Sequence, residues 1–113
     1  MPNPVYPPSS PEIAHQRREL APDIHKAWDE FSRKVFADGA LPAKFKHLIA
    51  IAAAHVTQCP YRIRAHTRAA LRSGATREEI MEAIWVSAEM RAGGAFAHST
   101  VSLSAMNELK SSE

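Results

Sequence analysis

Apolar residues recur at helical spacing along most of the chain, and no segment shows the strict apolar–polar alternation of a half-buried strand. In the first third of the chain, two such runs flank Pro22. Proline removes a backbone donor and clashes with the carbonyl one turn earlier, so the sequence predicts a break near Ala21. We expect two helices there, over about 11–20 and 22–37, with Ser10 as the N-cap of the first.

The most apolar stretch of the sequence, residues 48–54, belongs to a predicted third helix over about 42–56. A helix that is apolar on every side is typical of the centre of a bundle, so we expect this one to be buried. The helical pattern resumes over about 60–73. Pro60 suits the first turn of this fourth helix, and Gly74 suits the left-handed position that follows a helix.

The last part of the chain predicts two further helices. Thr76 and Glu79 have the spacing of a capping box, which marks the start of a fifth helix. Gly93-Gly94 is expected to interrupt it, and a sixth helix is expected over about 95–109. The predicted fold class is therefore all-α, a bundle of about six helices.

The composition fits a single domain preceded by a short arm. The chain has 113 residues, of which 45% are hydrophobic, enough for one buried core. Five of the eight prolines lie in residues 1–11, a composition that favours an extended arm, either a free tail or a strap onto a neighbour. The helical domain is expected over residues 12–110.

Charge, hydropathy and cysteine content exclude several function classes. Fourteen Lys and Arg against twelve Asp and Glu give a net charge of +2, too small for a surface built to bind nucleic acid. The longest apolar run, residues 48–54, is far shorter than the about 20 residues that span a bilayer. The N-terminus lacks the features of a secretion signal, so we expect a cytoplasmic protein. The single cysteine excludes a disulfide framework within one subunit.

One segment, residues 57–66, contains a nucleophile, cations and a base at close spacing. Cys59 precedes the predicted fourth helix, and the positive end of a helix dipole stabilises a thiolate. Arg62 and His66 lie four residues apart and therefore share one face of that helix. The spacing permits a thiol, a guanidinium and an imidazole in one pocket. The alternative is a buried Cys59, an exposed Arg62 and a His66 with a structural hydrogen bond.

Other polar residues give weaker patterns. His47 and His55 can share a broad face of the third helix, but a metal site needs three or four ligands, and no ligand motif surrounds either histidine. No metal and no cofactor are therefore predicted. Arg64, Arg68 and Arg72 form a stripe on the fourth helix, which is typical of a solvated face.

Residues 53–94 resemble a known family. They contain, in order, HVTQCPY, AHTRAAL, SGAT, EEI and EAI, followed by MRAGGAFAH. This order and spacing resemble the carboxymuconolactone decarboxylase and alkylhydroperoxidase D-like family over about residues 12–106. The resemblance implies an all-α bundle whose helices pair between subunits into homotrimers or homohexamers.

The peroxidase branch of this family carries the motif Glu-x11-Cys-x-x-Cys-x3-His, in which the second cysteine attacks the peroxide and the first resolves it. The resemblance implies that Cys59 is the first cysteine and His66 the histidine. His47 stands at the position of the glutamate, and Arg62 stands at that of the second cysteine. Because the motif holds one thiol here, a disulfide cycle between its two cysteine positions cannot run.

The resemblance leaves three functions open. The first is a one-cysteine, peroxiredoxin-like antioxidant peroxidase that uses an external thiol reductant. In it Cys59 is the nucleophile, His66 the base and His47 part of the proton relay, while Arg62 holds the thiolate. Peroxidase-type ancestry is favoured because Cys59 and the two residues after it are retained.

The second function is an acid–base enzyme or binder of a small organic acid or lactone, similar to the decarboxylase branch. Arg62 and its neighbour Tyr61 would then contact the substrate, and His66 or His47 would move the proton. The third is a non-catalytic oligomeric member of the family, or a Cys-to-Arg variant of an active peroxidase whose activity is impaired by Arg62.

Overall fold

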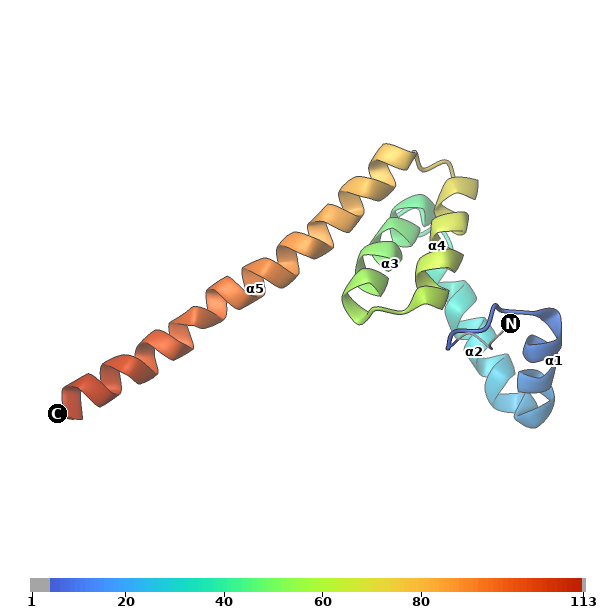
Figure 1. The fold of residues 1–113 in the computed structure, drawn as a ribbon. Coiled ribbons are helices and arrows are strands. Elements are labelled where there is room, and N and C mark those ends of the chain that lie inside the picture. Colours follow the sequence, from blue (N-terminus) through green and yellow to red (C-terminus); the bar gives the residue numbers. More distant parts are fainter. Residues whose placement is uncertain (1–4, 113) are drawn as a thin grey trace.

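The computed structural model describes residues 5–112 and, within them, five helices and no strand (Figure 1). The helices are α1 (Pro11–Leu20), α2 (Pro22–Phe36), α3 (Ala43–Thr57), α4 (Pro60–Arg72) and α5 (Arg77–Ser112). The predicted all-α class is confirmed. The bounds of the first four helices differ from the predicted ones by one residue at most.

Local chemistry explains where these helices begin and end. The Ser10 hydroxyl accepts the backbone N–H of Ile13 at 3.2 Å, which confirms the predicted N-cap of α1. Ala21, with φ −151°, separates α1 from α2 directly before Pro22. Gly74 has φ +93° after α4, a conformation that costs glycine little because it has no Cβ.

The predicted interruption at Gly93-Gly94 is wrong. Helix α5 runs unbroken from Arg77 to Ser112, so the described residues form five helices rather than six. Glycine lowers helix stability by about 1 kcal/mol relative to alanine, but it keeps its backbone donor and, unlike proline, does not force a break. The residues on both sides of the two glycines are rich in alanine and carry the helix across them.

The core lies where α3 packs against α4 and the first part of α5. It consists of buried Ile51, Ala70, Ala75 and Ile80, with Leu48 and Ile84 packed against them. The prediction of a buried third helix is confirmed for one side of α3 only. On that side Ile51 and Ala54 are buried, whereas Ile49 is 56% exposed.

The molecule is elongated because α5 extends far beyond α3 and α4, while α1 and α2 lie at the other end (Figure 1). Its dimensions are 65 × 35 × 33 Å, and its radius of gyration is 20.1 Å, against about 13 Å expected for a compact chain of this length. Its accessible surface of 9262 Å² also exceeds the about 6,200 Å² expected for a folded monomer of 12.5 kDa. Within the described residues, no helix is both long and apolar enough to cross a membrane.

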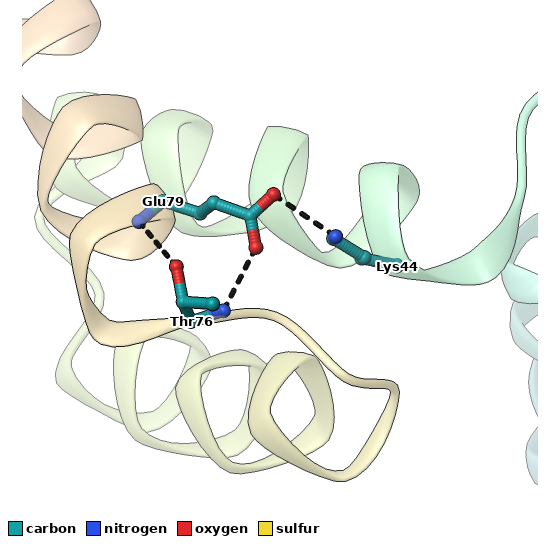
Figure 2. Close-up of polar contacts among 3 residues, drawn as sticks. All are labelled: Lys44, Thr76 and Glu79. Atoms are coloured by element: carbon teal, nitrogen blue, oxygen red, sulfur yellow. Dashed lines mark hydrogen bonds and ion pairs between the residues drawn. The ribbon is translucent and has the colours of Figure 1, made fainter.

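The start of α5 is fixed by the predicted capping box (Figure 2). The backbone N–H of Glu79 donates to the Thr76 hydroxyl at 3.0 Å, and the backbone N–H of Thr76 donates to the Glu79 carboxylate at 2.8 Å. Lys44 of α3 pairs with the other carboxylate oxygen at 2.9 Å. The backbone N–H of Thr76, and then Lys44, hold the pKa of Glu79 below its ordinary value. These contacts tie the start of α5 to the start of α3.

We expect Thr76→Ala to lower the free energy of unfolding by about 1 kcal/mol, because the hydroxyl that accepts the Glu79 N–H is lost. Glu78→Gln is the matched control, since Glu78 lies in the same turn outside the capping box, and its expected effect is below about 0.5 kcal/mol. Urea unfolding followed by circular dichroism, at one fixed protein concentration, measures both. Equal effects of the two substitutions would show that the capping box does not stabilise α5.

Candidate functional site

Two histidines meet where α3 packs against α4. His47 comes from α3 and His66 from α4, and their Nδ1 atoms are hydrogen-bonded at 3.1 Å. His66 is 8% exposed, and His47 is half-buried. The close packing of the two helices therefore joins residues 19 positions apart in the sequence.

One aromatic residue of α2 covers this histidine pair, and a second one contacts Arg62. The ring of Phe36 stacks on that of His47, with centroids 4.9 Å apart and an interplanar angle of 1°. The same ring lies 4.6 Å from that of His66. The guanidinium of Arg62 lies over the ring of Trp28, also in α2, with its Cζ atom 5.7 Å from the ring centroid. Helix α2 therefore shields one side of the pair and positions the guanidinium.

Burial and neighbouring positive charge favour neutral imidazoles. Desolvation lowers the pKa of His66, and the charges of Arg62 and His47 lower it further. The pKa of His47 is lowered by desolvation and then by the charge of Arg72. Because the ordinary value is 6.5, both rings are predominantly neutral at pH 7.

A neutral pair joined through its Nδ1 atoms has complementary Nε2 atoms. The ring whose Nδ1 donates the hydrogen bond has a lone pair at Nε2, whereas the ring whose Nδ1 accepts it has a proton at Nε2. The pair therefore offers one base and one acid. A proton that crosses the bond between the rings exchanges these two roles, an arrangement suited to acid–base chemistry near neutral pH.

Cys59 lies apart from these contacts. It is the half-buried N-cap residue of α4, and its backbone N–H donates to the Ala54 carbonyl at 3.2 Å. Among the described residues, no hydrogen bond joins its thiol to His66 or Arg62. The structure thus places Arg62 within electrostatic reach of His66, but it shows no such link for the cysteine.

Tyr61 contacts the N-terminal arm. Its hydroxyl donates to the Pro7 carbonyl at 2.7 Å, and its ring meets that of Tyr6 edge to face at 6.0 Å. The described part of the arm therefore packs against α4 of its own chain. Residues 1–4 lie outside the described residues.

The remaining histidine of α3 has a local partner, because His55 Nδ1 donates to the Ile51 carbonyl at 2.8 Å. Over residues 5–112, no group of three or more His, Cys, Asp and Glu side chains is placed to hold a metal ion.

Sequence reasoning missed three residues at the site: Phe36 and Arg72, which act on the histidine pair, and Trp28, which contacts Arg62. The two aromatic residues belong to the apolar pattern of α2, and Arg72 ends the arginine stripe that suggested a solvated face. The sequence feature that could have pointed to Phe36 and Trp28 is the high number of aromatic residues in α2. It does not reveal which of them face the histidines, because that depends on how α2 lies against α3 and α4.

The fold and the site define a small all-helical protein with a shielded histidine pair between two packed helices. The sequence profile of the carboxymuconolactone decarboxylase family matches residues 22–101, a range that includes both histidines. The chain therefore belongs to the carboxymuconolactone decarboxylase family.

The chain is also similar to individual relatives and solved structures. A Paracoccus denitrificans protein named "Uncharacterized protein 4 in cox locus" is 56% identical over 86 residues, which are 76% of this chain and 78% of that protein. The crystal structure of the apo form of a carboxymuconolactone decarboxylase family protein from Legionella pneumophila has a TM-score of 0.66 at 31% identity, covering 86% of this chain and 89% of that one. A crystal structure from Methanobacterium thermoautotrophicum has a TM-score of 0.69 at 31% identity, covering 74% and 93%.

Proposed function

We propose that the chain is an acid–base enzyme that moves a proton on a small organic acid or lactone, with His47 and His66 as its catalytic pair. The observation that carries the proposal is the 3.1 Å hydrogen bond between the two imidazoles. A neutral imidazole is a competent base at pH 7, and general acid–base catalysis contributes about 10²–10⁴-fold to a rate. The name of the family, which refers to a lactone decarboxylase, agrees with this chemistry.

The proton transfer balances within the pair. The Nε2 lone pair of one ring takes a proton from the substrate, and the proton on its Nδ1 passes to Nδ1 of the other ring. That ring then returns its own Nε2 proton to a second position of the substrate. The two rings end with their tautomers exchanged and no net charge, so the pair can act again from the opposite side.

Arg62 is the proposed carboxylate-binding residue. It is exposed, it lies one turn before His66 on α4, and its charge reaches that ring. The face of its guanidinium lies over Trp28. Because N–H donors lie along the edge of a guanidinium, they stay free for a bidentate contact with a carboxylate.

A one-cysteine peroxidase is the second candidate, and the position of Cys59 at the start of α4 favours it. Its thiolate would attack a hydroperoxide to give a sulfenic acid and an alcohol. Two equivalents of an external thiol would then reduce the sulfenic acid, releasing water and their own disulfide.

Two assays separate these candidates. The first measures hydroperoxide consumption with a dithiol reductant, and the second measures exchange of deuterium from solvent into a panel of small carboxylic acids and lactones. The acid–base proposal expects exchange that Cys59→Ser leaves unchanged. Hydroperoxide turnover that Cys59→Ser abolishes, without any exchange, would overturn it. Arg62→Cys, which restores the second thiol, shows whether the remaining peroxidase machinery is intact.

We further propose that the chain forms a homo-oligomer, a trimer or a hexamer, through α5. One face of this helix holds buried Ile80 and Ser87. The opposite face carries Trp85, Phe96 and Leu103, which are 66%, 81% and 54% exposed. At about 3.6 residues per turn these three residues fall on one stripe. Monomeric proteins rarely expose such a stripe, and a second copy of the chain is the proposed partner.

A cytoplasmic location stays a prediction.

A further inference from the structure

The N-terminal arm forms a wall beside α4. The hydrogen bond from the Tyr61 hydroxyl to Pro7 and the ring contact between Tyr6 and Tyr61 hold it in place. These contacts join parts of the chain 54 positions apart. The arm therefore encloses space against the helix.

A cavity of about 540 Å³ lies between the arm and the helix. Its walls include Tyr6, Pro7 and Pro8 from the arm and Tyr61, Arg64 and Arg68 from α4. The volume falls within the range of small-molecule sites. Neither His47 nor His66 lines this cavity, so it is separate from the proposed catalytic pair.

Arg64 and Arg68 form the charged wall of the cavity. They lie one turn apart on α4, and both are exposed. Neither takes part in the ion pairs found among the described residues. A shallow, open depression of about 440 Å³ lies along the other flank of the same two arginines, beside Ile63 and Thr67. Two guanidiniums that border open space and have no carboxylate partner in residues 5–112 favour an anionic ligand.

We propose that the cavity under the arm binds a small aromatic anion. Its ring would lie against the tyrosine and proline side chains, which offer apolar and edge-to-face contacts. Its carboxylate would accept hydrogen bonds from Arg64 and Arg68. An inorganic anion would leave the apolar walls unfilled, and a neutral ring would leave the guanidiniums without a partner.

Calorimetric titration with naphthoate tests the ligand class. Naphthamide is the neutral isostere, and inorganic phosphate is the anion without a ring. We expect naphthoate to bind, and the other two to bind at least about tenfold more weakly. If naphthamide binds as tightly as naphthoate, the arginines do not contribute to binding. If phosphate binds as tightly as naphthoate, the aromatic walls do not contribute. Either result overturns the proposal, as does an absence of naphthoate binding.

Variants locate the bound naphthoate. Arg64→Gln combined with Arg68→Gln changes only exposed side chains and is expected to weaken binding at least about tenfold. Arg33→Gln is the matched control, because Arg33 is an exposed arginine of α2 that does not line the cavity, and we expect the affinity of this variant for naphthoate to stay within about twofold. Arg62→Gln tests the alternative location, the proposed catalytic site. If Arg62→Gln abolishes binding and the double variant does not, naphthoate occupies the proposed catalytic site and the second site does not exist.

A third variant tests the arm. Tyr61→Phe keeps the aromatic wall but loses the hydrogen bond to Pro7, so we expect naphthoate to bind a few-fold more weakly. Unchanged affinity in this variant would show that the arm is not part of the site.

Discussion

Replacing His66 by asparagine is expected to lower kcat by about 100-fold or more while the protein stays folded. The asparagine side chain places a polar atom near the position of Nδ1, so the hydrogen bond to His47 is kept. It has no counterpart of Nε2, at which the pair exchanges protons with the substrate. The measurement is kcat on a substrate found by the exchange assay, with Cys59→Ser as the control that keeps its activity.

The double variant sharpens this test. His47→Asn alone is expected to cause a similar loss, and His47→Asn with His66→Asn little more, because the two rings act as one unit. Losses that multiply in the double variant would mean that the rings act independently, against the proton transfer between them.

The lowered pKa values set the pH dependence of the same pair. As the pH is lowered, activity should fall only below pH 6.5, the ordinary pKa of histidine, because both imidazoles keep their neutral form to a lower pH. The pH of this fall is the acidic limit of activity. Arg72→Gln removes a charge that lowers the pKa of His47 and should move this limit upward. In the unfolded chain both histidines bind protons at a higher pH than in the folded protein. The contribution of the two histidines to the free energy of unfolding is therefore complete above pH 6.5. It is lost as the pH falls through their pKa values in the folded protein.

Phe96→Glu is expected to convert the oligomer into a protomer of 12.5 kDa. Phe96 is 81% exposed in the single chain, and burying a carboxylate in an apolar interface without a partner costs several kcal/mol. Ala105→Glu is the matched control, since it adds the same charge on the same helix at about 180° from Phe96. Light scattering after size-exclusion chromatography gives the mass of each variant.

Two results would contradict the proposed interface. If the unmodified protein has the mass of a single chain at micromolar concentration, the oligomer does not form. If Ala105→Glu dissociates it as fully as Phe96→Glu, the stripe that contains Phe96 is not what holds the subunits together.

Local chemistry accounts for the part of the fold that the sequence predicted. Pro22 and Pro60 mark helix starts because proline cannot continue a preceding helix, and Gly74 marks a stop through its backbone conformation. The two adjacent glycines of α5 gave the wrong boundary because glycine only weakens a helix. Their effect depends on neighbouring residues, which here favour the helix.

The candidate site shows a different limit. Spacing singled out His66, and the family resemblance assigned His66 and His47 to one proton relay. The structure shows in addition that their Nδ1 atoms are hydrogen-bonded. Phe36 and Arg72 escaped notice because their effect on the pair depends on the packing of α2 and α4 around α3. Spacing within one helix predicts which residues share a face, but it does not predict which residue of another helix meets them.

The core of the protein is local in sequence. Its residues lie between Leu48 and Ile84, and the connections between α3, α4 and α5 are the short segments 58–59 and 73–76. Short loops close at little entropic cost, and helical chains with contacts close in sequence fold rapidly. The central stretch can therefore form its core early in folding, and the arm, the first two helices and the far half of α5 can join it afterwards.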